Sequence, residues 1–210
     1  MISIKVDTKA AVKYIRGVAE RQIPYACMIG LNNTAFKVKD AEVVALEKHL
    51  DRPTPFTKRG YEVVKAAKSK LVASIRARAI QGEYLKYQIF GGSRAPKAIA
   101  NVLPKGAKLT GYGNLPKGAI KRMLMDKKRY FSGVPKGGGP AGIYRRLGTT
   151  SKRLAAGQRG RVKLQLMTGW IGTARYKPRL PFEQVAKDEV ARVFRPEFDK
   201  ALARALSTPK

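Results

Sequence analysis

The sequence predicts an α+β fold in which N-terminal helices and a C-terminal helix pack on a small antiparallel sheet, with long basic loops. Apolar residues recur at helical spacing over residues 1–50 and again after Phe182, and alternating patterns typical of strands lie between them. Hydrophobic residues make up 44% of the 210 residues, which is enough for a core. We expect a single domain built from an N-terminal strand and helices (1–50), a proline elbow and β-hairpin (51–80), a basic loop-rich region with strands (81–180) and a C-terminal helix (181–210).

The first 50 residues predict a short strand followed by two helices. Ile2–Val6 alternates apolar and polar side chains, and Asp7-Thr8 is a suitable N-cap for a helix that runs to about Arg21. Ile23-Pro24 interrupts this helix, and Pro24 suits the first turn of a second helix that ends near Leu50. The buried face of the second helix is expected to contain Ala26, Ile29, Asn33, Phe36, Val43 and Leu46.

An elbow and a hairpin are predicted next. Two prolines prevent a helix from continuing through Asp51–Thr57, because each fixes its own backbone and restricts the residue before it. Alanines and lysines then favour a helix, but every second residue from Leu71 to Ala79 is apolar. The alternation predicts a β-hairpin of Glu62–Ala67 with Leu71–Arg78.

The middle of the chain predicts short elements joined by turns. Pro-Lys-Gly occurs at residues 104–106, 116–118 and 135–137, and proline in the second position of a turn with glycine in the fourth is typical turn chemistry. Short helices are predicted over Tyr84–Phe90 and, with a basic character, over Ile120–Lys128. Strands are predicted over Tyr130–Val134, Gly142–Arg146 and Val162–Trp170.

An amphipathic helix is predicted from Phe182 to near the end of the chain. Its apolar face is expected to contain Val185, Ala186, Val190, Val193, Phe194, Phe198, Ala201, Leu202 and Ala205. Pro196 lies inside this pattern and is expected to kink the helix or divide it in two.

Positive charge is concentrated in the middle of the chain. The formal net charge is +30, and Tyr84–Phe182 holds 22 lysines and arginines with Asp126 as its single acid. Such a density of one sign destabilises an isolated compact chain through self-repulsion, which a polyanion or an acidic partner would relieve. The residues that we expect to contact DNA or an acidic partner are Lys127, Lys128, Arg129, Arg145, Arg146, Lys152, Arg153, Arg159, Arg161 and Lys163.

Catalytic chemistry is poorly supported. His49 is the single histidine and is expected at a helix end, and Cys27, the single cysteine, is expected to be a small buried side chain. Gly133–Gly142 is rich in glycine but lacks the Gly-Lys-Ser/Thr ending of a nucleotide-binding loop. We therefore expect no enzyme activity, no cofactor and no metal site. The sequence also contains no apolar run of 18 residues, so we expect no contact with a membrane.

Aromatic residues lie among the basic ones, and they leave two interpretations open. Rings between cations can stack on the bases of single strands. The same rings can instead fill the core of a sheet, which is the interpretation that we favour. The rings concerned are Tyr130, Phe131, Tyr144, Trp170 and Tyr176. No zinc finger, helix-turn-helix or RNP-type motif is present, so sequence-specific contact with nucleic acid is not expected.

Several motifs of the chain form a recognisable set. The most specific block is N-terminal: Arg21-Gln22-Ile23-Pro24-Tyr25-Ala26, Leu31-Asn32-Asn33-Thr34-Ala35 and Asp51-Arg52-Pro53-Thr54-Pro55-Phe56-Thr57. The set continues in Gly142-Ile143-Tyr144-Arg145-Arg146 and in the closing segment from Phe182-Glu183-Gln184-Val185-Ala186 through Phe198 and Ala201-Leu202. Together these motifs resemble the minor tail proteins of tailed bacteriophages, the group that includes the lambda Z-type tail-completion protein.

This resemblance implies a structural component of the virion, assembled in the host cytoplasm and located in the neck or upper tail. It implies a sixfold or twelvefold homo-oligomeric ring around the DNA channel. The partners would be other neck, tail-terminator, tail-tube or tape-measure proteins, together with double-stranded DNA bound without sequence preference. Composition alone fits an alternative equally well, which is a ribosomal-type or nucleoid-associated protein that binds nucleic acid non-specifically.

Overall fold

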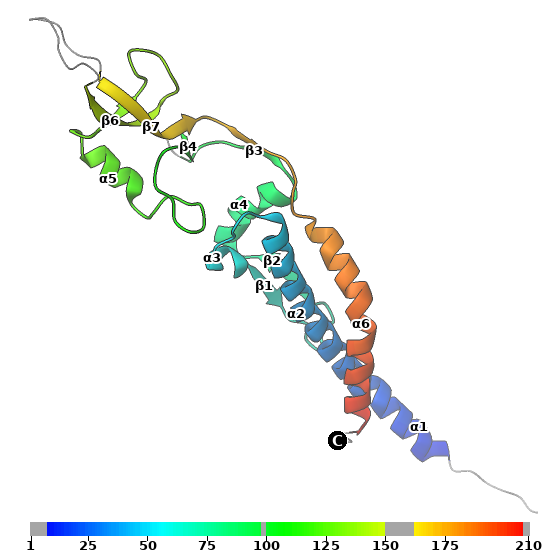
Figure 1. The fold of residues 1–210 in the computed structure, drawn as a ribbon. Coiled ribbons are helices and arrows are strands. Elements are labelled where there is room, and N and C mark those ends of the chain that lie inside the picture. Colours follow the sequence, from blue (N-terminus) through cyan, green and yellow to red (C-terminus); the bar gives the residue numbers. More distant parts are fainter. Residues whose placement is uncertain (1–7, 98–99, 150–161, 208–210) are drawn as a thin grey trace, which may run out of the picture. The chain divides into compact units, whose positions relative to one another are not determined.

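The computed structural model describes residues 8–97, 100–149 and 162–207. The chain divides into two compact units, which we call unit 1 (residues 1–89 and 178–210) and unit 2 (residues 90–177) (Figure 1). Helix accounts for 47% and strand for 22%, with helices at both ends and small antiparallel sheets, so the predicted α+β class is confirmed. The single-domain interpretation stays a prediction.

The N-terminal helices of unit 1 form a continuous run. α1 (Thr8–Gly17) leads through a π-helical turn (Val18–Gln22) into α2 (Ile23–His49), and the N–H of Ile23 donates to the carbonyl of Val18. The predicted interruption at Ile23-Pro24 is wrong. The π-helical turn ends where α2 begins, so Pro24, which has no N–H, lies in the first turn of α2 and the helical path continues. The strand predicted over Ile2–Val6 lies outside the described residues.

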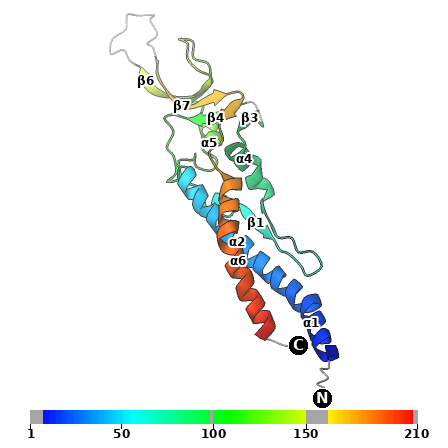
Figure 2. The ribbon, with the colours of Figure 1, turned by 90° about the vertical axis from the view of Figure 1, so that its right-hand side faces the viewer.

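The buried face of α2 is only partly the predicted one. Ala26 and Leu46 are buried as expected, but 39% of Phe36 is exposed. The remaining buried positions are Gly30, Thr34, Ala35, Val38, Glu42 and Ala45. Small residues dominate because α2 lies beside α6 (Phe182–Ser207) (Figures 1 and 2). A Cβ at Gly30 would lie 3.0 Å from the Cα of Phe198, so the two backbones approach too closely for larger side chains there.

α6 confirms the predicted C-terminal helix. It contains Pro196 without being divided, and its fully buried residues include Val193, Ala201 and Ala205 from the expected face. Val190 remains 44% exposed, and the buried Glu197 was not predicted.

The β-hairpin and the elbow before it are also confirmed, with shorter strands. β1 (Tyr61–Val64) pairs antiparallel with β2 (Ser74–Ala77), in the register Tyr61 opposite Ala77. In the elbow, Thr54 caps α3 (Pro55–Lys58) by accepting a hydrogen bond from the N–H of Thr57 at 3.2 Å. α4 (Ala79–Ile89) starts five residues earlier than predicted. The main core of unit 1 joins these elements through Ala45, Leu46, Tyr61, Leu85 and Leu180.

Unit 2 is built on an antiparallel sheet with the strand order β4-β7-β6-β5. The three predicted strands are present as β5 (Tyr130–Gly133), β6 (Gly142–Thr149) and β7 (Val162–Ile171). α5 (Ala119–Met125) packs on the sheet where Met123 joins Ile143 and Met167 in a small core. The sequence did not predict β4 (Asn101–Pro104) or the separate pair of β3 (Gly92–Arg94) and β8 (Ala174–Tyr176).

The three Pro-Lys-Gly segments are not equivalent, and the predicted turn positions are wrong. At residues 104–106, the N–H groups of Lys105 and Gly106 donate to carbonyls on β7, so this copy continues the pairing of β4. In the other two copies proline is the first residue of the turn. Its carbonyl accepts from the residue three positions later, at 3.0 Å both for Pro116 and for Pro135.

Candidate functional site

The candidate site is the basic surface of unit 2. This unit contains 20 lysines and arginines and one acid, a net charge of +19, whereas unit 1 contains 24 basic and 13 acidic residues. Six of the ten predicted contact residues fall in the described part of the chain, and all six are exposed: Lys127, Lys128, Arg129, Arg145, Arg146 and Lys163. The other four, Lys152, Arg153, Arg159 and Arg161, lie outside the described residues.

The first three of these cations occupy the turn between α5 and β5, which Asp126 organises. The Asp126 carboxylate accepts the N–H of Arg129 at 3.0 Å, and its main-chain carbonyl accepts the N–H of Tyr130 at 2.9 Å. The side chain of Arg129 also forms an ion pair with Asp126, with 3.7 Å between Nε and Oδ2. The single acid of unit 2 is therefore used to shape a turn that presents Lys127 and Lys128 to solvent.

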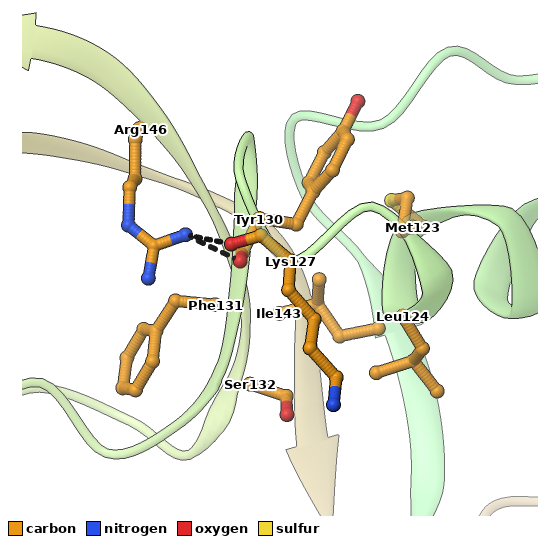
Figure 3. A pocket seen from close by; sticks show the side chains of 8 residues that line it. All are labelled: Met123, Leu124, Lys127, Tyr130, Phe131, Ser132, Ile143 and Arg146. Carbon is orange, nitrogen blue, oxygen red and sulfur yellow. Dashed lines mark hydrogen bonds between the residues drawn. The ribbon is translucent and has the colours of Figure 1, made fainter.

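Arg146 has a structural role that the sequence did not predict. Its Nη1 donates to the carbonyls of Lys127 and Tyr130, each at 2.6 Å (Figure 3). It also donates to the carbonyl of Lys128 at 3.3 Å. Hydrogen bonds from a guanidinium are charge-assisted, so Arg146 ties the turn after α5 to β6. The interpretation of Arg146 as a simple contact residue is thus incomplete. Its Nη1 already donates hydrogen bonds within the protein, whereas Nε and Nη2 form no hydrogen bond within the described residues.

Arg145 and Lys163 come from neighbouring strands and share one face of the sheet by register. Arg145 on β6 is paired with Gln165 on β7, and Lys163 lies two residues along β7 from Gln165. Residues two apart in a strand point to the same face, so the two cations are diagonal neighbours. Neither forms an ion pair within the described residues. These two positions are the clearest anion contacts among the predicted ones.

A small pocket adjoins the turn. It has a volume of about 240 Å³ and is lined by Met123, Leu124, Lys127, Tyr130, Phe131, Ser132, Ile143 and Arg146 (Figure 3). Its lining combines apolar side chains with two cations, both among the predicted contact residues. The apolar part was not predicted, because residues from α5, β5 and β6 that are far apart in sequence form it together.

Most of the aromatic side chains belong to the packing of the sheet, which supports the core interpretation. Tyr144 is buried, its ring lies 6.1 Å from that of Phe131, and its hydroxyl donates to the carbonyl of Pro140 at 2.6 Å. Tyr130 and Trp170 pack against the core around Ile143. Tyr176, on β8, is half-buried.

Histidine, cysteine and carboxylate side chains do not gather into a candidate metal site in the described ranges. No group of three or more histidine, cysteine, aspartate or glutamate side chains is close enough there to hold a metal ion. His49 is the last residue of α2, as predicted, whereas Cys27 is half-buried rather than buried. In residues 8–97, 100–149 and 162–207, no helix is long and apolar enough to span a bilayer.

The most perturbed carboxyl lies in unit 1. Glu42 on α2 is 0% exposed, and neither of its carboxylate oxygens has a hydrogen-bond partner. Burial raises the pKa of Glu42 to about 8. The hydroxyl of Tyr61 is also buried without a partner, and its pKa is raised by burial and by the charge of Glu42. Glu42 is therefore neutral through much of the physiological pH range, and no sequence pattern marked it.

Glu197 is the other buried carboxyl, and it is satisfied. It accepts hydrogen bonds from Lys37 at 2.7 Å and from Asn33 at 3.1 Å, joining α2 to α6. The hydrogen bond from Lys37 is the main cause that lowers its pKa.

Comparison with known proteins adds no relative. No protein-family model, curated protein or solved structure matches the chain significantly.

Proposed function

We propose that this chain is a structural protein of a tailed-phage virion that completes the tail end and stabilises the head–tail junction. In this proposal the basic surface of unit 2 faces DNA or the acidic lumen of a tail tube. One observation carries the proposal: unit 2 offers a single carboxylate, already used in the turn after α5, to 20 cations. Its charge is therefore balanced from outside the unit.

The positions of the resembling motifs lend support. Asn32, from the N-terminal block, donates to the carbonyl of Ala66 and accepts from its N–H, tying α2 to the hairpin. Asn33 joins α2 to Glu197 on α6. Thr54, from the proline block, caps α3. These polar residues hold unit 1 together, so a scaffold role explains why the motif is built from them.

The resemblance implies a homo-oligomeric ring, and the charge argument adds a condition for its assembly. Cations gathered around a lumen would repel one another unless a polyanion occupies it, so assembly and DNA binding would be coupled. The resemblance suggests six or twelve copies, with other neck or tail proteins as neighbours. Contacts to phosphates would make binding strong at low salt and indifferent to sequence.

The native mass of the purified protein, with and without double-stranded DNA at two salt concentrations, tests this proposal. We expect a discrete ring, or a monomer that assembles when DNA or other virion proteins are added, and DNA binding that weakens as salt rises. A protein that remains monomeric and binds RNA much more tightly than duplex DNA would contradict the proposal and favour the ribosomal-type alternative.

A further inference from the structure

The hairpin of unit 1 extends beyond its paired strands into a basic tip, residues 65–72. In Figure 2 the chain between β1 and β2 forms a loop that projects beyond these strands. The tip closes in a tight turn, in which Ala67 and Lys70 exchange two main-chain hydrogen bonds of 3.0 Å. Apart from Ala66, every residue of the tip is exposed. This segment lies outside the basic middle in which the sequence placed all contact residues.

The tip is held in place against α2. Asn32 forms two hydrogen bonds with the main chain of Ala66, at 3.1 Å from its amide nitrogen and 2.7 Å to its amide oxygen. These bonds explain why Ala66 is buried while its neighbours are exposed. A doubly anchored turn presents its side chains from a fixed base, which reduces the entropy lost on binding.

Three lysines of the tip, Lys65, Lys68 and Lys70, form no ion pair within the described residues. The cations of α6 in unit 1 behave differently. On α6 the cations are paired with acids of the same helix, as Lys187–Glu183, Arg192–Glu189, Arg195–Asp199 and Lys200–Glu197. Unit 1 thus neutralises one of its surfaces and leaves the hairpin tip positive.

Aromatic rings of α2 position two of these lysines. The ammonium of Lys65 lies 5.5 Å from the ring centroid of Phe36, and that of Lys68 lies 5.0 Å from the ring centroid of Tyr25. Lys39 lies on the same Phe36 ring at 5.6 Å. Cation–π contacts of this kind orient a lysine without neutralising it. Lys39 is also paired with Asp40, at 3.4 Å, whereas Lys65 and Lys68 keep an unpaired positive charge beside α2 within the described residues.

We propose that the tip of the β1–β2 hairpin is a second DNA-binding surface, whose lysines contact the phosphates of duplex DNA. This inference rests on the DNA contact in the proposed function and adds unit 1 to it. The cations of the tip are lysines, which bind phosphates as compact point charges. Duplex DNA presents phosphates in a dense regular array and releases counterions when cations neutralise them, so we assign duplex DNA as the occupant.

The test uses the triple variant Lys65→Gln, Lys68→Gln and Lys70→Gln. Its affinity for a fluorescent duplex is measured by anisotropy over a range of salt concentrations. Each lost phosphate contact reduces the slope of log affinity against log salt by about 0.9. We expect the slope to fall by about 2 to 3 and the affinity at 0.1 M salt to fall on the order of 100-fold. A wild-type slope and affinity would overturn the inference.

The matched control removes the same charge from α6, through Lys187→Gln, Arg192→Gln and Arg195→Gln. These cations are already paired, so the control should change the affinity much less than the tip variant does. If both triple variants weaken binding equally, the effect is one of net charge and the tip has no specific role. Circular dichroism and thermal unfolding of both variants check that the fold is retained.

A third variant separates the failure of this inference from the failure of the proposed function. Arg145→Gln with Lys163→Gln alters unit 2 alone. Loss of binding in this variant but not in the tip variant overturns the inference and leaves the function standing. Loss in the tip variant alone overturns unit 2 as the DNA surface and leaves the inference standing.

If the wild type binds poly-glutamate as tightly as duplex DNA, and the tip variant loses both equally, the partner is an acidic protein and the assignment to DNA is overturned.

Discussion

The two units handle charge in opposite ways. On α6 of unit 1, cations are paired with acids three or four residues away, and the buried Glu197 is held by Lys37 and Asn33. In unit 2 the one carboxylate shapes a turn, so the unit contains no further acid that could pair with its other cations. Surface ion pairs contribute little to stability, about 0 to 1 kcal/mol each. The contrast therefore concerns how each surface is neutralised: α6 is neutralised by its own acids, whereas in the proposed function a partner neutralises unit 2.

The largest expected effect tests Glu42, a buried carboxyl of unit 1 whose oxygens have no hydrogen-bond partner. An unfolded glutamate keeps its ordinary pKa of 4.5, while burial raises the pKa of folded Glu42 to about 8. Between these values the unfolded chain releases the proton and the folded chain retains it. The contribution of Glu42 to stability is therefore greatest below about pH 4.5 and is lost as pH rises to 8, by at most about 1.4 kcal/mol for each pH unit.

Glu42→Gln replaces the neutral carboxyl with a neutral group of the same shape. We expect the variant to be more stable than the wild type at pH 8 and to differ little at pH 5. Urea unfolding at several pH values measures this. Asp40→Asn is the control, because Asp40 lies exposed on the same helix. Parallel pH profiles for the wild type and Glu42→Gln would show that Glu42 is solvated and ionised in the folded protein.

The second prediction concerns the close packing of unit 1. Gly30→Val adds a Cβ 3.0 Å from the Cα of Phe198, so the backbones of α2 and α6 must separate. We expect a loss of about 1 to 3 kcal/mol in the free energy of unfolding. Gly172→Ala in unit 2 is the control, because its Cβ meets open space. Equal stability of the two variants would mean that α2 and α6 are packed less tightly than described.

Sequence reasoning succeeded where one local pattern decided the structure. α6, β5, β6, β7 and the β1–β2 hairpin follow apolar periodicity, so they could be predicted. The alternation of Leu71 to Ala79 correctly outweighed the helix propensity of alanine and lysine as far as Ala77, although the residues from Ala79 onward belong to α4.

It failed where contacts distant in sequence decided the outcome. The buried face of α2 is set by the close approach of α6 at Gly30, and no periodicity of α2 encodes that approach. β3, β4 and β8 depend on pairing partners far along the chain. In the candidate site, exposure of the cations followed from their charge, but the carbonyl contacts of Arg146 require the fold of the α5–β5 turn.

The third prediction tests the charge contrast by comparing one face of the sheet in unit 2 with α6 in unit 1. Arg145→Gln with Lys163→Gln should leave the thermal stability of the protein unchanged, because neither side chain forms an ion pair within the described residues. Affinity for duplex DNA at 0.1 M salt should fall roughly tenfold or more, with a salt slope reduced by about 1 to 2. Arg192→Gln with Arg195→Gln, on α6, is matched in charge. Equal loss of affinity in both pairs would mean that net charge, rather than the face of the sheet, governs binding.

The smallest expected effect separates two adjacent arginines in unit 2. Arg146→Gln removes the charge-assisted hydrogen bonds to the carbonyls of Lys127, Lys128 and Tyr130, so the turn after α5 loosens. We expect a loss of about 1 to 2 kcal/mol in the free energy of unfolding, whereas Arg145→Gln should cost almost nothing. Chemical denaturation followed by the fluorescence of Trp170, in the same unit, measures both.

Arg146→Lys is the informative companion, because it keeps the charge but replaces the guanidinium by a shorter, single-centred donor. If Arg146→Lys unfolds like Arg146→Gln while binding DNA better than it, Arg146 holds the turn through its geometry and contributes its charge separately. If all three variants unfold like the wild type, the carbonyl contacts do not hold the turn, and Arg146 belongs with Arg145 as a surface cation.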